Sequence, residues 1–105
     1  EKSPLKSAFL TNVSNILGLN CKIICNDINF VKIESNYIVC RAFRKLPYIL
    51  NISRENCTKK HKIIIMKGRN AQQEINNTSM MNNYKYRLEN SITDSDSKII
   101  ILNAK

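Results

Sequence analysis

The apolar positions near the start of the chain recur every three or four residues, which is the spacing of one helix face. Ser3-Pro4 is typical of an N-cap followed by a proline in the first helical turn. Gly18 favours the end of the helix, because glycine readily adopts the conformation that terminates one. A helix is therefore predicted over residues 4–19. Its apolar face is expected to lie in the core and consists of Leu5, Phe9, Val13 and Ile16.

A second stretch, residues 35–50, shows the same helical period. Pro47 argues against an unbroken helix, because a proline in a helix interior costs about 3 kcal/mol. The segment is therefore predicted to be a helix that is kinked or that ends near Leu46. The apolar positions that carry the pattern are Ile38, Val39, Ala42, Leu46, Ile49 and Leu50.

The rest of the chain is less regular. Residues 21–35 are expected to be a long connection with one short strand. The run Ile63-Ile64-Ile65 fits a strand or a buried helix segment, and periodicity does not separate the two. A last helix is predicted from Thr78 to Ile92, and the apolar run near the end of the tail 93–105 has no clear place in the pattern.

Length and element pattern together indicate an all-α fold. A chain of 105 residues fits a single domain, residues 1–105, with a core of modest size. Three or four amphipathic helical segments and only two glycines predict a small helix bundle. No apolar run approaches the length of a membrane span, so no membrane insertion is expected.

The charge balance points to an acidic partner. The chain has 17 Lys and Arg against 8 Asp and Glu, a formal net charge of +9. Such an imbalance suits an acidic receptor face, a sulfated sugar such as heparin, or nucleic acid. The basic run around Lys62, Lys67 and Arg69 is the strongest candidate for that contact.

Four cysteines, at positions 21, 25, 40 and 57, suggest a disulfide framework if the chain is extracellular. They allow three complete pairings, between which the residues alone do not choose. The spacings Cys21-x3-Cys25 and Cys57-x3-His61 make a poor zinc site, so no metal is expected. His61, flanked by Lys60 and Lys62, is expected to be a solvated surface residue.

Two further features favour secretion. Sequons at Asn12, Asn51 and Asn76 are candidate glycosylation sites. Residue 1 is Glu rather than Met, which fits a mature chain whose signal peptide has been removed.

The segment Ile38-Val39-Cys40-Arg41-Ala42, with Leu46, Cys57 and then Lys59-Lys60, resembles the interleukin-4 family. The resemblance implies a short-chain four-helix bundle, up-up-down-down with long crossover connections. It also implies a secreted, monomeric cytokine that binds a receptor alpha chain and signals in immune cells, with no catalysis and no cofactor. A Cys21–Cys57 disulfide is implied too, which leaves Cys25 and Cys40 as the second pair. Arg69 matches a receptor contact of the family, and Lys62 and Lys67 accompany it.

Three other classes of protein share some of these features. A chemokine-like ligand that binds a receptor and sulfated glycans would pair Cys21 with Cys40 and Cys25 with Cys57. An intracellular module that binds nucleic acid or zinc is disfavoured by the sequons and by the lack of a nucleic-acid motif. An enzyme is the least expected class, since the eight carboxylates are scattered and no nucleophile has a visible base.

Overall fold

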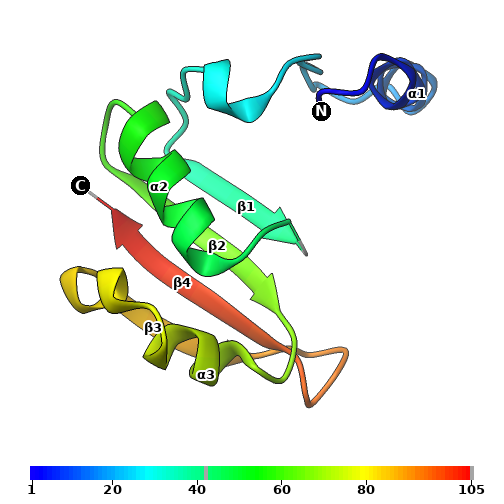
Figure 1. The fold of residues 1–105 in the computed structure, drawn as a ribbon. Helices are drawn as coiled ribbons and strands as arrows, with labels where there is room; N and C mark the ends of the chain where they lie inside the picture. The colour runs from blue at the N-terminus through cyan, green and yellow to red at the C-terminus, as the bar shows by residue number, and fades with distance from the viewer. Residues whose placement is uncertain (42, 105) are drawn as a thin grey trace. The chain divides into compact units, whose positions relative to one another are not determined.

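The computed structural model describes residues 1–41 and 43–104, and the chain falls into two compact units, Glu1–Val31 and Lys32–Lys105. The first unit contains helix α1 (Pro4–Ile16) and the 3₁₀ turn η1 (Ile28–Phe30). The single domain expected for residues 1–105 stays a prediction. The second unit contains, in chain order, β1 (Tyr37–Arg41), α2 (Leu46–Asn56), β2 (His61–Lys67), α3 (Ala71–Asn76), η2 (Ser79–Asn83), β3 (Lys85–Asn90) and β4 (Lys98–Ala104) (Figure 1).

Helix α1 begins where the sequence predicts. The Ser3 hydroxyl accepts a hydrogen bond from the Lys6 N–H at 3.3 Å, and Pro4 occupies the first turn. The expected core face is wrong, however, because Leu5 is 83% exposed and Phe9 66% exposed. The buried residues of α1 are instead two serines, Ser7 and Ser14.

The second unit is a mixed α/β fold that consists of a four-stranded sheet and helices. Its four strands lie in the order β1-β2-β4-β3. β1 runs parallel to β2, and helix α2 connects them; β4 is antiparallel to both of its neighbours. The expected all-α four-helix bundle is therefore wrong. The parallel pair requires a crossover connection, and α2 provides it.

Pro47 explains the largest error in the secondary structure. It lies in the first turn of α2, where the missing N–H of a proline leaves no helical hydrogen bond unmade. The predicted helix over residues 35–50 is thus a strand followed by the start of a helix. In the strand, Ile38 and Cys40 pack toward the core while Tyr37 and Val39 are exposed, which is the alternation of a half-buried strand.

The chain after α2 is also mainly extended rather than helical. Ile63-Ile64-Ile65 lies in β2, which decides the alternative that periodicity left open. The helix predicted over residues 78–92 is wrong, since this segment forms η2 and β3. The apolar run near the chain end, which has no clear place in the helical pattern, forms β4. This strand lies inside the sheet and pairs with both β2 and β3.

The core lies between one face of the sheet and the helices α2 and α3 (Figure 1). Full burial of a leucine or isoleucine contributes roughly 1.5–3 kcal/mol. Residues without measurable exposure come from both layers: Leu46, Leu50, Ile63, Ile100 and Leu102.

A buried polar pair joins α2 to β2. His61 is 5% exposed, so its expected place on the surface is wrong. Its Nε2 lies 2.5 Å from the Ser53 hydroxyl, and its Nδ1 lies 2.8 Å from the Lys59 carbonyl oxygen. Because a carbonyl only accepts, Nδ1 carries a proton, and in the neutral imidazole Nε2 therefore accepts from Ser53.

Ser53→Ala is expected to lower the free energy of unfolding by about 1–3 kcal/mol, because the buried Nε2 then has no donor. Urea denaturation measures the change, and Ser95→Ala in the exposed β3–β4 loop is the control. Equal unfolding midpoints for Ser53→Ala and Ser95→Ala would contradict the assignment.

Candidate functional site

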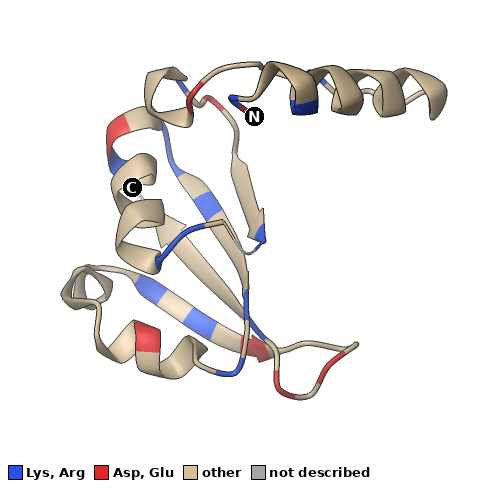
Figure 2. Ribbon diagram, turned by 45° about the vertical axis from the view of Figure 1, so that its right-hand side comes forward, with Lys and Arg blue, Asp and Glu red and all other residues tan. Residues whose placement is uncertain are grey.

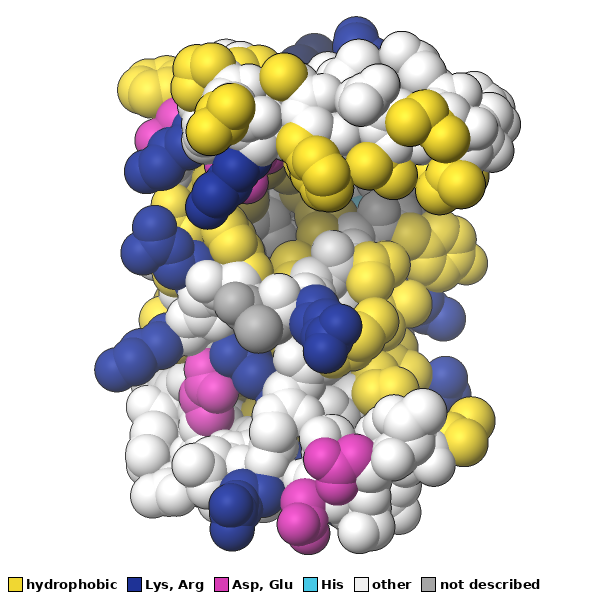
Figure 3. All heavy atoms as spheres, turned by 90° about the vertical axis from the view of Figure 1, so that its right-hand side faces the viewer, with side chains coloured by type: hydrophobic (Ala, Val, Ile, Leu, Met, Phe, Trp, Pro, Cys, Tyr) yellow, Lys and Arg dark blue, Asp and Glu magenta, His cyan; other side chains and the backbone are white. Residues whose placement is uncertain are grey.

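The candidate site lies at the carboxyl ends of the parallel strands. β1 ends at Arg41 and β2 at Lys67, and because the two strands are parallel their ends meet at one edge of the sheet. Ligands of open α/β sheets bind outside this edge. Figure 3 views the molecule from the side toward which β1 and β2 point in Figure 1, and lysine and arginine side chains are spread widely over it.

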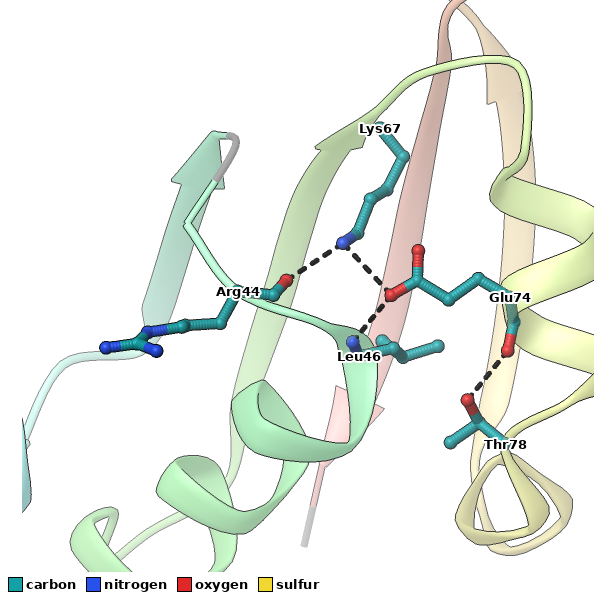
Figure 4. A network of polar contacts seen from close by, with 5 residues as sticks. All are labelled: Arg44, Leu46, Lys67, Glu74 and Thr78. Atoms are coloured by element: carbon teal, nitrogen blue, oxygen red, sulfur yellow. Dashed lines mark hydrogen bonds and ion pairs between the residues drawn. The ribbon is translucent and has the colours of Figure 1, made fainter.

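Glu74 of α3 caps the start of α2. One of its carboxylate oxygens accepts a hydrogen bond from the Leu46 N–H at 2.6 Å (Figure 4). Lys45, at the N-cap position, makes no side-chain cap bond, so Glu74 satisfies a donor that would otherwise lack a partner. A negative charge at a helix N-terminus is also favoured by the helix dipole.

Lys67 connects the same carboxylate to the loop after β1. Its ammonium lies 3.1 Å from Glu74 Oε1 and donates to the Arg44 carbonyl oxygen at 2.9 Å (Figure 4). The Lys67 and Glu74 side chains are only 15% and 25% exposed, so this ion pair is poorly screened by solvent. Together the two residues fix the loop that precedes α2 against the end of β2.

An aromatic and cationic cluster lies on that loop. The Phe43 and Tyr48 rings meet edge to face with 5.9 Å between centroids. The Arg44 guanidinium lies 5.0 Å from the Tyr48 centroid and 6.0 Å from that of Phe43. Such cation–π contacts hold the guanidinium in place without neutralising its charge.

Two hollows open at this edge. The α2–α3 hollow has a volume of about 530 Å³. Its lining combines cationic side chains of the loop before α2 with amide side chains in and next to α3. The lining residues are Phe43, Arg44, Lys45, Pro47, Lys67, Asn70, Gln73, Glu74, Asn77 and Thr78. The β1–β4 hollow has a volume of about 440 Å³ and is lined by Arg41, Met66, Lys67, Gly68, Ser91, Thr93, Ser97, Lys98 and Ile99. Lys67 borders both.

The positive charge of the chain belongs mainly to the second unit. Residues 32–105 hold 14 of the 17 Lys and Arg but six of the eight Asp and Glu, so eight of the nine net charges lie there. Figure 2 shows the Lys and Arg segments on the strands and on the turns at their ends. The chemistry at this edge therefore suits a polyanion.

The cysteines form no disulfide within the described part of the chain. Cys21 and Cys25 are exposed in the first unit, while Cys40 lies half-buried in β1 and Cys57 is buried after α2. The expected disulfide-stapled fold is thus corrected. No group of three possible metal ligands occurs among residues 1–41 and 43–104.

The exposed and the buried thiols are expected to react with an alkylating reagent at different rates. Burial raises the pKa of the Cys40 thiol, an effect that the charge of Lys67 partly opposes, so little thiolate is available at neutral pH. Iodoacetamide should modify Cys21 and Cys25 well before Cys40 in the folded protein, and all at similar rates in urea. Mass spectrometry of timed digests measures the order, and rapid native labelling of Cys40 would contradict it.

The basic residues expected to bind a receptor lie at two places. Lys67 belongs to the site, and Arg69 is exposed in the turn between β2 and α3. Lys62 lies near the opposite end of β2 and borders a different hollow with Lys85 and Arg87. Asn12, Asn51 and Asn76 have exposed side chains, and their glycosylation stays a prediction.

Comparison with known proteins identifies the family. The family model of rRNA small subunit methyltransferase G matches residues 1–100. The ribosomal RNA small subunit methyltransferase G of Pelagibacter ubique is 35% identical over 106 residues, which cover 100% of this chain and 49% of that protein. The protein of the same name from Orientia tsutsugamushi (strain Ikeda) is 34% identical over 95% of this chain and 50% of its own length. The one from Rickettsia felis is 35% identical over 90% of this chain and 49% of its own length. The chain belongs to the rRNA small subunit methyltransferase G family. It spans about half the length of these relatives.

The family overturns the functional expectations. The resemblance to interleukin-4 is wrong, and so are the cytokine function, the chemokine alternative and secretion as a ligand. The expectation that the chain is no enzyme fails, because the family and its members are named for methylation of ribosomal RNA. For the same reason the exclusion of nucleic acid as a partner is wrong. The receptor role of Arg69, Lys67 and Lys62 followed from the resemblance and loses its basis. No helix in the described residues is both long and apolar enough to span a bilayer.

Sequence reasoning missed Glu74 and Lys98 as site residues and left Arg41 open between a solvated face and a contact for an acidic partner. A usable signal was present: two β-prone runs, residues 37–40 and 63–66, flank a helix that begins at a proline. That order predicts a strand–helix–strand unit, whose carboxyl edge is the usual place for a site. The helical period over residues 35–50 concealed it.

Proposed function

We propose that this protein transfers a methyl group to RNA of the small ribosomal subunit, and that the edge where β1 and β2 end faces the RNA. Membership of the family over residues 1–100 is the observation that carries the proposal. The chain spans about half of its relatives, so the described residues account for part of such a site.

The described side chains suit the binding of RNA. The cations of the loop after β1 and of the turn after β2 can neutralise backbone phosphates, which supply most of the affinity for nucleic acids. Phe43 is 46% exposed and is one of the residues that line the α2–α3 hollow. An exposed ring of this kind can stack on an unpaired base, the usual target of RNA-specific proteins.

Methyl transfer also needs a donor, whose activated methyl group is attacked by a lone pair of the RNA. The described residues contain two glycines, and only Gly68 lies in a turn between a strand and a helix. A glycine-rich turn is the usual cradle of a nucleotide-containing cofactor. Residues 1–41 and 43–104 do not fit this pattern, and no donor site is assigned to them.

Transfer of labelled methyl from S-adenosylmethionine to purified ribosomal RNAs tests the function. The protein should label RNA of the small subunit and leave RNA of the large subunit unlabelled. A folded protein that labels both RNAs equally, or that binds neither of them, would contradict the proposal. Circular dichroism establishes that the sample is folded.

A further inference from the structure

The β1–β4 hollow gathers three cations from three adjacent strands. Arg41 ends β1, Lys67 ends β2 and Lys98 begins β4, and all three line the hollow. Lys67 and Lys98 are direct cross-strand partners. Like charges in this position repel one another, so an anion between them would relieve the repulsion.

Only part of this charge is balanced within the protein. Lys67 pairs with Glu74, but Lys98 donates to a neutral group, the Asn90 amide oxygen, at 2.5 Å. Arg41 makes no ion pair within the residues that the structure describes. Two uncompensated charges thus face one hollow from its two sides.

Of the acids next to the hollow in sequence, Glu89 and Asp94 already have partners. Glu89 pairs with Arg87 at 3.4 Å. Asp94 accepts the Asp96 N–H and the Ser97 hydroxyl at 2.9 and 3.1 Å, which closes the β3–β4 loop on itself. The lining of the hollow contains no carboxylate.

Hydroxyls complete the lining. Ser91, Thr93 and Ser97 reach the hollow from the β3–β4 loop. The Ser97 hydroxyl donates to Asp94, and the Ser91 and Thr93 oxygens lie 3.2 Å apart, so one hydroxyl of that pair is left to donate to an anion. Hydroxyls beside lysine and arginine are the groups that commonly bind phosphate oxygens of nucleic acids. The floor includes Met66 and Ile99, which are paired in register across β2 and β4.

We propose that the β1–β4 hollow binds a backbone phosphate of the RNA, through Arg41 and Lys98 with one hydroxyl of the Ser91 and Thr93 pair. The choice of RNA as the source of the phosphate rests on the proposed function. The anion site itself rests on the charges and hydroxyls of the hollow. Such a contact fixes the register of the RNA on the protein and does not read its sequence.

Two measurements test the site separately from the function. In the first, inorganic phosphate is titrated into ¹⁵N-labelled protein at constant ionic strength and followed by NMR. Saturable shifts are expected at the amides of Gly68, Ser91, Thr93, Ser97 and Lys98. Lys98→Gln should remove most of the response, and Lys98→Arg should retain it. Absence of saturable shifts in the wild-type protein, or their persistence in Lys98→Gln, would overturn the site.

The second measurement is the salt dependence of binding to small-subunit RNA. Lys98→Gln should weaken binding and reduce the slope of log K against log salt by about 1, which corresponds to the loss of one phosphate contact. Lys32→Gln is the matched control, because Lys32 is an exposed lysine that pairs with Glu34. Equal slopes for Lys98→Gln and Lys32→Gln would overturn the assignment of an RNA phosphate. A wild-type protein that binds phosphate in the hollow but binds no RNA would contradict the proposed function and leave the anion site supported.

Discussion

Replacing Ile100 with alanine is expected to lower the free energy of unfolding by about 2–5 kcal/mol, the range observed when a large buried side chain leaves a cavity. Ile100 has no exposed surface and lies in β4, between Ile65 of β2 and Leu88 of β3. Its loss therefore affects both pairings of the central strand. Urea denaturation followed by circular dichroism measures the change.

Ile92→Ala is the matched control. It removes the same atoms from a fully exposed side chain in the loop between β3 and β4, so the unfolding midpoint should stay within experimental error. Similar losses for Ile100→Ala and Ile92→Ala would contradict the central position of β4 in the sheet.

Replacing Glu74 with alanine is expected to have the second large effect. The change leaves the Leu46 N–H without an acceptor and the Lys67 ammonium without its counter-ion, at a cost of about 2–4 kcal/mol of unfolding free energy. Methyl transfer should fall by about tenfold or more, because displacement of the loop after β1 misplaces groups that orient the substrate. Urea denaturation and the labelled-methyl assay measure the two effects.

Glu74→Gln separates the two roles of the carboxylate. An amide oxygen can still accept from Leu46 but cannot pair with an ammonium, so an intermediate loss of stability is expected. A double-mutant cycle of Glu74→Ala with Lys67→Met should give a coupling above about 0.5 kcal/mol. Strict additivity of the two substitutions would contradict the ion pair as a determinant of this site.

Parts of the first unit could be predicted from local signals alone. Ser3-Pro4 placed the start of α1, because capping and the first-turn proline depend on adjacent residues only. The apolar face of α1 was identified by its spacing, but spacing does not say what covers the face. In this structure Leu5 and Phe9 are exposed.

The sheet could not be found in this way, because its strands are defined by partners that are far apart in sequence. The run near the chain end looked unplaced, yet Ile100 and Leu102 are fully buried between two other strands. Pro47 argues against a helix when it lies in the interior, but it is favourable in the first turn, where the structure has it. Periodicity over 35–50 fitted both interpretations.

The site was missed for a related reason. Glu74 acts on Leu46, 28 residues earlier, through a bond that no local pattern signals. The net charge correctly indicates an acidic partner, whereas the four cysteines and the sequons point to secretion and so to the wrong class. Sequons arise by chance in an Asn-rich chain, and cysteines indicate disulfides only in an oxidising compartment.

Cross-linking between the protein and RNA of the small ribosomal subunit tests the central claim most directly. Ultraviolet irradiation of the complex, followed by mass spectrometry of peptides, locates the residues in contact with RNA. The expected contacts fall at the edge where β1 and β2 end, on residues 41, 43–45, 67–70 and 91–98. Contacts confined to the opposite ends of these strands, around Asn36 and residues 59–62, would contradict the assignment of this edge as the face that meets RNA.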